Sequence, residues 1–373
     1  MKKIFFFARD PGGANVILPI YEKMNNQFET LIYAKDFALQ KLRSASIPAI
    51  DIQEECKLTE IQDVCDFLKR INPDAIVTGT SLDDYTERYL WKAAENLRIK
   101  SFAILDQWMN LGIRFSEYTY EQEELYEKCH EHRYLPYRVL VMDELAKATL
   151  MEEGIDKTRI VITGQPHFDT VRAKYQQVEP IYNGEYWNII FVSEPISQDY
   201  DGNDKNKLYW GYNEETIFGQ LYGCLAKIAG SLSKQIRMII RPHPREDIRH
   251  WEGIVRTLTC DNIILELDAQ NDSFSILKSA DIVCGMSSMF LLEAVICEKP
   301  ILSIEIGLQR ENPFVLDKVG ISRSVLTEEE LVLRLTQTIS KLQDGKRAET
   351  LEFNFIKDAI GSIVSVIEEE INK

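Results

Sequence analysis

The sequence predicts an α/β protein built from two doubly wound, Rossmann-like domains, each with a parallel sheet. Short apolar runs of strand length alternate with segments of helical length along almost the whole chain. This alternation occurs twice, and a polar stretch without strand periodicity separates the two series. The chain of 373 residues also exceeds the size at which a single hydrophobic core stops growing. Two domains of ordinary size are therefore expected.

The first series of expected strands defines an N-terminal domain, which we place at residues 1–170. Each run is short, apolar and followed by a segment long enough for a helix. The expected strands cover residues 4–7, 30–34, 75–78, 101–105, 138–142 and 159–163.

The second series defines a C-terminal domain at residues 188–349. Residues 171–187 between the series are polar and include Pro180 and the Asn183-Gly184 pair, so we place the linker there. Within 350–373 the apolar spacing of residues 351–372 predicts a long amphipathic helix, which we expect to pack back on the N-terminal domain. The expected strands cover residues 188–193, 237–240, 262–267, 281–284 and 300–306.

The composition argues against several classes of protein. A formal net charge of −16 opposes attraction to nucleic acid. No stretch approaches the roughly 18 apolar residues of a membrane-spanning helix, and the first apolar run is too short for a signal peptide. Seven cysteines without a disulfide framework indicate reduced thiols. We expect a cytoplasmic protein with no transmembrane segment and no nucleic acid partner, and peripheral membrane association stays open.

Two short strings in the second half each follow an expected strand. They are Arg241-Pro242-His243-Pro244 and Gly285-Met286-Ser287-Ser288. The carboxyl ends of parallel strands share one edge, where open α/β sheets bind ligands. Serine hydroxyls and the free N–H groups of a helix beginning near Ser287 can hold phosphate oxygens, and His243 can donate a further hydrogen bond. The strings predict a nucleotide site; for either one alone, an ordinary turn or helix start is the alternative.

These motifs resemble those of the GT-B glycosyltransferases and their epimerase relatives, over most of the chain. Two strings support the resemblance: Gly285-x-Ser287-Ser288 followed by Glu293-Ala294, and the segment 163–169, which is similar to a Gly-Asn-Pro-x-x-Asp element. The resemblance implies two domains that face each other across a cleft. It also implies that Glu293 holds the nucleotide ribose, with a partly exposed helix charge as the alternative. We assign Arg241 and Ser193, which also follow expected strand runs, to the same nucleotide site.

The combination of His-Pro and Ser-Ser strings resembles that of bacterial sialyltransferases, capsule Kdo transferases and CDP-glycerol glycerophosphotransferases. This implies a cytidine-activated donor whose phosphate contacts His243, Ser287 and Ser288, which would stabilise the charge of the leaving group. The acidic-acidic-glycine motif of sialyltransferases is not recognisable, so UDP donors stay open. The Gly-Thr-Arg-Pro-Glu string of UDP-N-acetylglucosamine 2-epimerases is replaced by residues 10–15, Asp-Pro-Gly-Gly-Ala-Asn, which argues against an epimerase.

The N-terminal domain offers two candidate bases for an acceptor hydroxyl, as inverting transfer requires. Asp10 follows the first strand, and Gly12 with Gly13 would let the backbone approach a ligand closely. A helix cap or turn is the alternative for Asp10. Asp106, at the end of another strand, is the rival base.

The loop after Asp106 is the expected acceptor site. Trp108, Asn110 and Arg114 supply an aromatic face, an amide and a cation, which suit a sugar ring and its hydroxyls. A core position is the alternative for Trp108. The tyrosine-rich segment 117–137 is expected to be an acceptor lid, a partner surface or a solvated helical excursion.

Other polar groups are interpreted as structural. Ser81 and Asp84 have the spacing of a capping box. The segment 129–132, Cys-His-Glu-His, lacks the spacing of tetrahedral metal ligands. Asp199-Tyr200-Asp201 imitates the Asp-x-Asp metal motif of the other large glycosyltransferase fold, and we discount it because helix N–H groups replace the metal in GT-B sites.

The leading hypothesis from the resemblance is an inverting, metal-independent glycosyltransferase without a cofactor. It would move a sugar from a nucleotide-sugar donor, CMP-linked or UDP-linked, to a cell-surface polysaccharide or other glycan acceptor. The alternatives are a CDP-polyol phosphotransferase of teichoic-acid type and a non-catalytic nucleotide-sugar binding protein. A dehydrogenase is disfavoured because no Gly-x-Gly-x-x-Gly string follows a strand.

Overall fold

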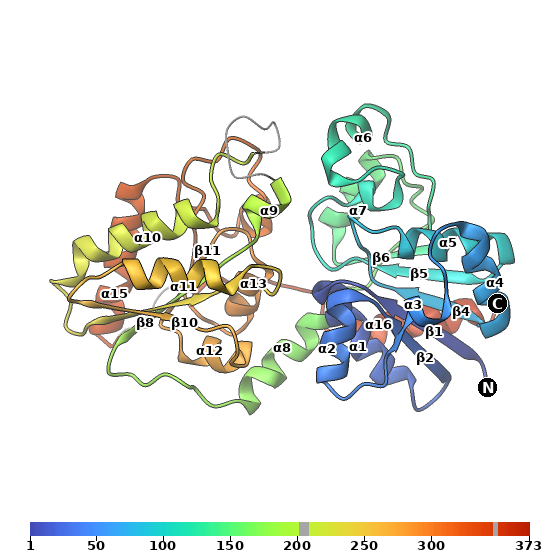
Figure 1. Ribbon diagram of the computed structural model, residues 1–373, viewed down its shortest axis with the longest axis horizontal. Helices are drawn as coiled ribbons and strands as arrows, with labels where there is room; N and C mark the ends of the chain where they lie inside the picture. Colours follow the sequence, from blue (N-terminus) through green and yellow to red (C-terminus); the bar gives the residue numbers. More distant parts are fainter. Residues whose placement is uncertain (201–208, 346–349) are drawn as a thin grey trace. The chain divides into compact units, whose positions relative to one another are not determined.

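A computed structural model of the chain describes residues 1–200, 209–345 and 350–373. The chain divides into two compact units, Met1–Thr170 with Phe355–Lys373, and Val171–Asn354. Each unit contains one parallel sheet with helices on both of its faces (Figure 1). The predicted fold class, α/β with two doubly wound domains, is confirmed.

The sheet of the N-terminal unit has seven strands in the order β3-β2-β1-β4-β5-β6-β7. Strands are added in one direction from β1 to β3 and in the other from β4 to β7, so the topological switch point lies between β1 and β4. All six expected strands occur. We missed β3, which has only two residues and so shows no periodicity. The strands are β1 (Lys3–Ala8), β2 (Glu29–Ala34), β3 (Ile50–Asp51), β4 (Ala75–Thr78), β5 (Lys100–Ile104), β6 (Arg138–Val141) and β7 (Ile160–Ile162).

Each face of this sheet has its own apolar core. One core lies under α1 (Pro11–Met24), α2 (Asp36–Ser44) and α16 (Ala359–Ile371). The core of the opposite face lies under α4 (Ile61–Ile71) and α5 (Thr86–Leu97). The other helices that begin in this unit are α3 (Ile52–Glu55), α6 (Glu123–Cys129), α7 (Glu144–Glu152) and α8 (Pro166–Gln177), with short 3-10 turns at Gly112–Phe115 and Tyr120–Gln122.

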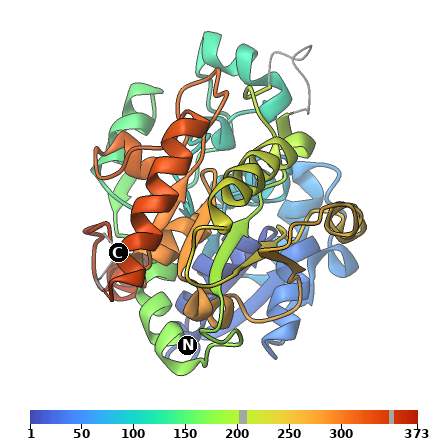
Figure 2. The same ribbon diagram turned by 90° about the vertical axis from the view of Figure 1, so that its left-hand side faces the viewer.

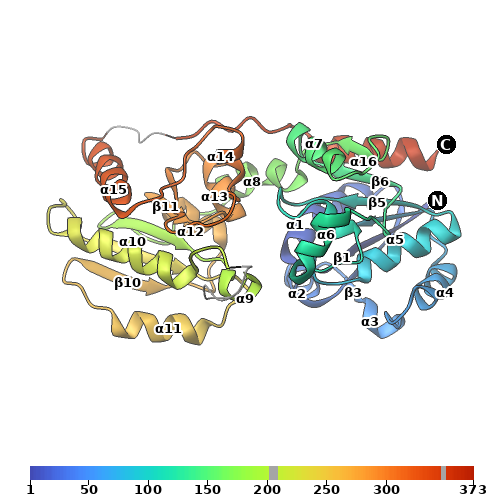
Figure 3. The same ribbon diagram turned by 90° about the horizontal axis from the view of Figure 1, so that it is seen from above.

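The C-terminal helix is shorter than expected. We predicted a helix over residues 351–372, but α16 begins at Ala359 because Asp358, in the left-handed conformation, caps it by accepting a hydrogen bond from the Gly361 N–H at 3.2 Å. Ile363 and Ile367 lie in the core beneath α1. At its other end, the Ile371 carbonyl accepts a hydrogen bond from Lys2, and Figure 3 shows α16 lying along this unit.

The sheet of the C-terminal unit has five strands in the order β10-β9-β8-β11-β12. All five expected strands occur, and the switch point lies between β8 and β11. The strands are β8 (Trp187–Val192), β9 (Ile236–Arg241), β10 (Ile263–Leu267), β11 (Ile282–Gly285) and β12 (Ile301–Ser303).

Helices cover both faces of the second sheet. Two of them, α10 and α11, lie on one side of it and α12 lies on the other (Figure 1). The neighbouring α15 packs along α10 (Figure 2). The helices are α9 (Ile196–Tyr200), α10 (Glu214–Ala229), α11 (Ile248–Thr257), α12 (Ser273–Ser279), α13 (Met289–Ile296), α14 (Val315–Lys318) and α15 (Glu328–Gln343).

The connections between the units differ from the expected linker. Residues 171–177 belong to α8, whose last turns contain good helix formers, so only residues 178–186 are irregular. The expected boundary at residue 349 lies outside the described residues. Within the described ranges, no helix is long and apolar enough to cross a bilayer.

Candidate active site

Asp10 lies at the switch point of the N-terminal sheet, directly before α1. Although it is the N-cap residue of that helix, its side chain makes no capping hydrogen bond, which argues against the purely structural alternative. Its carboxylate is 29% exposed and pairs with Arg9 at 3.2 Å. Burial raises the pKa of Asp10 to about 6; Arg9 and Ser81 oppose the rise, and Asp83 and Asp106 add to it. A carboxyl group with this pKa can exchange a proton near neutral pH.

Arg9 holds the acidic loops around Asp10 together. Its guanidinium also contacts Asp36 at 2.9 Å and Asp83 at 2.5 Å. Its positive charge is thus shared among three carboxylates and does not fully neutralise Asp10.

Asp106 at the end of β5 lies against the first turn of α1. A Cβ atom added at Gly12 would come within 1.9 Å of Asp106 Oδ2, and one added at Gly79 within 2.9 Å of the Gly13 Cα. Both glycines therefore allow the close approach of neighbouring parts of the protein, and their expected approach to a ligand stays a prediction.

The environment of Asp106 makes its negative charge less favourable than in water. Its side chain is 16% exposed and its Oδ1 lies 3.7 Å from Arg114 Nη1. Within the described residues this oxygen has no hydrogen-bond partner. Burial raises the pKa of Asp106, and Arg114 opposes the rise. Asp10 and Asp106 together give this site two carboxyl groups of shifted pKa.

Two side chains of the expected acceptor loop, Arg114 and Trp108, make structural hydrogen bonds. Arg114 is 3% exposed and donates to the Thr80 carbonyl at 2.6 Å and the Asn110 carbonyl at 3.0 Å. These contacts give it a structural role, and its expected role in acceptor binding stays a prediction. Trp108 is 8% exposed and donates its indole N–H to Asp143 at 2.8 Å, as expected for a core aromatic. Asn110 takes the left-handed conformation that turns this loop.

Glu87, which sequence reasoning missed, is buried behind Asp10. The Ser81 hydroxyl forms a hydrogen bond of 2.9 Å with Glu87 Oε1 and does not form the expected capping box; Asp84 instead accepts the Thr86 N–H. A detectable signal was present, because Glu87 falls on the same helical face as the buried residues Leu90, Trp91 and Ala94. A carboxyl group on the apolar face of an amphipathic helix indicates a buried acid.

In the C-terminal unit, Ser287 and Ser288 lie at the start of α13, as predicted from the sequence. The structure places this helix start at the switch point of the sheet. Ser288 caps the helix by accepting the Phe290 N–H at 3.2 Å. The Ser287 N–H and hydroxyl both donate to Glu194, at 2.8 and 3.1 Å. Burial raises the pKa of Glu194 to about 7, and the Ser287 hydrogen bonds oppose the rise. The groups expected to hold a phosphate thus hold a carboxyl group.

His243 lies in the loop after β9 and is held by local contacts. Its Nδ1 accepts the Arg245 N–H at 3.2 Å, which places the proton of the neutral ring on Nε2. Its own N–H donates to Glu246 Oε2 at 2.5 Å. The other Glu246 oxygen accepts Ser193 at 2.7 Å and Trp251 at 3.0 Å. The negative charge of Glu246 also contributes to the raised pKa of Glu194, which is consistent with the His-Pro and Ser-Ser loops lying near each other.

The remaining predicted nucleotide ligands have structural contacts. Arg241 donates to the Asp268 carbonyl at 3.1 Å and to Ser273 at 3.3 Å, which joins β9 to the loop after β10. Ser193 is 3% exposed, and its hydroxyl donates a hydrogen bond to Glu246. Neither contact favours the predicted role in binding nucleotide. Glu293 is 9% exposed on α13, so it is more buried than the partly exposed helix charge given as its alternative, and its role at the ribose stays a prediction.

Asp199 pairs with Arg245 through two hydrogen bonds, at 2.8 and 2.5 Å. Asp201, the other acid of the discounted metal motif, lies outside the described residues. Within residues 1–200, 209–345 and 350–373, no cluster of three His, Cys, Asp or Glu side chains could hold a metal ion.

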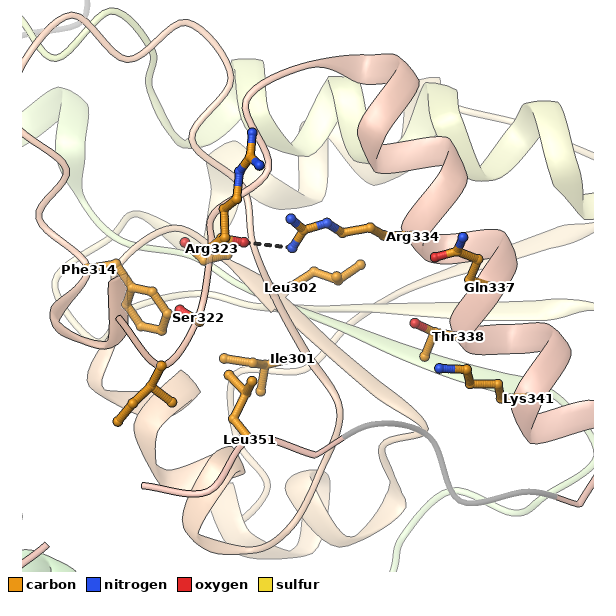
Figure 4. A pocket seen from close by; sticks show the side chains of 12 residues that line it. Ile301, Leu302, Phe314, Ser322, Arg323, Arg334, Gln337, Thr338, Lys341 and Leu351 are labelled. Carbon is orange, nitrogen blue, oxygen red and sulfur yellow. Dashed lines mark hydrogen bonds between the residues drawn. The ribbon is translucent and has the colours of Figure 1, made fainter. Parts of the chain in front are cut away.

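A cavity of about 460 Å³ lies beside β12, between this edge strand and α15 (Figure 4). Arg323, Arg334 and Lys341 give its wall a basic character, but Arg334 already donates to the Arg323 carbonyl at 2.6 Å and to Glu330 at 2.5 Å. None of the residues proposed above for the nucleotide site lines this cavity.

Comparison with solved structures shows the fold. No protein-family model and no curated protein matches the sequence. The chain is similar to UDP-GlcNAc 2-epimerase from Neisseria meningitidis bound to UDP-GlcNAc, with 15% identity, a TM-score of 0.66 and coverage of 98% of this chain and 100% of that one. It is also similar to MnaA of S. aureus in complex with UDP, with 14% identity, a TM-score of 0.67 and coverage of 100% of this chain and 97% of that one. The similarity to MurG of Acinetobacter baumannii has 12% identity, a TM-score of 0.52 and coverage of 99% of this chain and 100% of that one. The chain therefore has a GT-B-like fold.

Proposed function

We propose that this protein is an inverting, metal-independent glycosyltransferase that takes its sugar from a nucleotide-activated donor. The observation that supports this most is the start of α13 at the switch point between β8 and β11. There Ser287 presents an N–H and a hydroxyl that already hold a carboxyl group, and the same donors suit a phosphate. The solved structures of similar fold that contain UDP-GlcNAc or UDP agree with a nucleotide ligand.

In this proposal the N-terminal unit supplies the base. Asp10, ionised above about pH 6, takes the proton of the acceptor hydroxyl. The acceptor oxygen then bonds to the anomeric carbon while the bond from that carbon to the donor phosphate breaks. The Ser287 and Ser288 loop, with the Nε2–H of His243, stabilises the negative charge on the departing nucleotide. The acceptor is a glycan, and the donor is linked to CMP or UDP.

Epimerisation of a nucleotide sugar is the second candidate. Two observations favour it: the fold similarity to UDP-GlcNAc 2-epimerases, and the presence of two carboxyl groups of raised pKa, Asp10 and Asp106, at one sheet edge. Such a pair could remove and return a proton on a sugar carbon. The changed string at residues 10–15 is the argument against it.

Ligand binding and product analysis together test the proposal. We would measure thermal stabilisation by CMP, CDP, UDP and GDP for the parent chain and a Ser287→Ala variant, because a bound ligand raises apparent stability. The preferred nucleotide sugar is then incubated with glycan acceptors. A new glycoside and free nucleotide support transfer. An epimeric nucleotide sugar supports the second candidate, a phosphodiester supports polyol-phosphate transfer, and binding without any product supports a non-catalytic protein.

A further inference from the structure

Ser81 connects the buried acid Glu87 with the candidate base Asp10. The Ser81 hydroxyl lies 2.9 Å from Glu87 Oε1, and hydrogen bonding by the same hydroxyl opposes the rise in the pKa of Asp10. Ser81 and Glu87 are each 1% exposed, whereas the Asp10 side chain is 29% exposed. The three groups thus form a row that leads from the interior of the N-terminal unit to its accessible sheet edge.

The number of protons shared by Glu87, Ser81 and Asp10 decides which hydrogen bonds can form among them. A serine hydroxyl has one hydrogen to donate and lone pairs that accept. If Glu87 and Asp10 were both ionised, they would compete for that hydrogen, and one carboxylate would face a serine lone pair. If Glu87 bears a proton, it donates to Ser81 Oγ and the Ser81 hydrogen remains for Asp10. The protonated arrangement satisfies both contacts.

The surroundings of Glu87 favour the protonated form. Burial raises the pKa of Glu87 to about 8, the charges of Asp10 and Asp84 add to the rise, and Ser81 opposes it. Its second oxygen, Oε2, has no hydrogen-bond partner among the described residues. An unpaired carbonyl oxygen of a neutral acid costs less than an unpaired oxygen of a carboxylate.

Among the residues that the structure describes, no cation forms a salt bridge with Glu87. The adjacent Arg88 donates its Nε to the Arg114 carbonyl at 3.0 Å and its Nη2 to the Leu82 carbonyl at 2.9 Å. Asp84 pairs with Lys35 at 2.7 Å. On the other side of the row, the charges that act on Asp10 come from Arg9, Asp83 and Asp106.

We propose that Glu87 is a proton-bearing positioning residue, which donates to Ser81 and thereby directs the Ser81 hydroxyl toward Asp10. Glu87 does not touch substrate and transfers no proton during turnover. Its role rests on the proposed function, because it positions the base of that reaction. The protonation state of Glu87 does not rest on it and can be measured without any substrate.

The arrangement limits activity at both ends of the pH range. Asp10 must be ionised to act as a base, so activity rises as pH passes about 6. When Glu87 loses its proton near pH 8, the Ser81 hydroxyl turns back to Glu87. Asp10 then loses a donor and faces a second negative charge. Turnover is therefore expected to fall above about pH 8.

A carboxyl titration of the full chain tests the protonation state. The glutamate side-chain carboxyls are labelled with carbon-13, and the Glu87 signal is identified by its loss in Glu87→Gln. We expect this signal to shift near pH 8. A shift near the ordinary glutamate value of about 4.3 would overturn the proposal. This outcome does not depend on whether the protein is a glycosyltransferase.

The pH profile of turnover, with the nucleotide sugar and acceptor found above, tests the positioning role. Glu87→Gln keeps a donor toward Ser81 and cannot ionise, so the decline above pH 8 should disappear. Glu87→Leu removes the donor. Its turnover at pH 7 should be at least tenfold lower than that of Glu87→Gln. Glu95→Gln, an exposed glutamate on the same helix, is the matched control and should keep the parent profile. A decline above pH 8 that persists in Glu87→Gln contradicts the positioning role.

If the parent chain shows no turnover with any donor, the proposed function fails, while the carboxyl titration still decides the state of Glu87. A Glu87 signal near pH 8 without turnover would show a buried neutral acid and no catalytic positioning. The two failures are therefore distinguishable.

Discussion

Glu194 and Ser287, 93 residues apart in the sequence, form a two-point contact at the start of α13. The Ser287 N–H donates to one carboxyl oxygen at 2.8 Å, and its hydroxyl lies 3.1 Å from the other. A carboxylate at a helix N-terminus is favoured by the helix dipole, just as a phosphate is. A nucleotide phosphate that binds to Ser287 must therefore displace Glu194 or bind beside it.

Replacing Glu194 by Gln should strengthen nucleotide binding. The amide carries no charge that competes with phosphate, so we expect UDP or CMP to bind about tenfold more tightly at pH 8, which is ~1.4 kcal/mol. At pH 6 the gain should be small, because Glu194, with a pKa raised to about 7, is then mostly protonated in the parent. Titration calorimetry at both pH values checks this. Glu329→Gln, an exposed charge on α15, is the control, and equal affinities at pH 8 would contradict the competition.

Gly12→Ala should impair turnover more than stability. The new Cβ would lie 1.9 Å from Asp106 Oδ2 and would force that carboxyl group aside, which a flexible side chain can do at modest cost. We expect a loss of less than about 2 kcal/mol in the free energy of unfolding and at least a tenfold loss of turnover if Asp106 takes part. Urea unfolding and product formation measure the two effects. Gly223→Ala, in open space on α10, should affect neither strongly, and full turnover in Gly12→Ala would remove Asp106 from the mechanism.

Trp108→Phe distinguishes a core residue from an acceptor-binding one. The change removes the hydrogen bond to Asp143, whose other carboxyl oxygen caps α7 through the Ala146 N–H. Loss of this buried bond should lower the free energy of unfolding by about 1–2 kcal/mol. The KM for the acceptor should stay near the parent value. A raised acceptor KM with unchanged stability would restore the role that the sequence first suggested.

The strand pattern was predictable because buried parallel strands have a local signature of short, continuous apolar runs. The same pattern placed Ser287 and Ser288 correctly at a helix start. The partners of these side chains were not predictable, because the Glu194 contact joins loops that follow different strands. The residue types of Arg114 and Trp108 show which ligands they could bind. Tertiary packing decides that their N–H groups instead donate to Thr80 and Asp143.

Glu370→Gln should weaken the attachment of the C-terminal helix and change its response to acid. Glu370 accepts hydrogen bonds from Arg138 at 2.7 Å and from Tyr137 at 2.9 Å, which join α16 to β6. Burial alone would raise the pKa of Glu370, but these bonds outweigh it and lower the pKa to about 2. A lowered carboxyl pKa stabilises the folded chain above the unfolded value of about 4.3, and this stabilisation is lost as pH falls toward 2.

The variant should therefore lose about 1–3 kcal/mol in the free energy of unfolding at pH 7. Its stability should also fall less steeply than that of the parent between pH 4.3 and 2. Urea unfolding across this range measures both effects, with the exposed neighbour Glu369→Gln as the control. If both variants lose stability equally, or if the acid dependence is unchanged, the contact of Glu370 with Arg138 is not the source of the stabilisation, and the apolar face of α16 alone holds the helix in place.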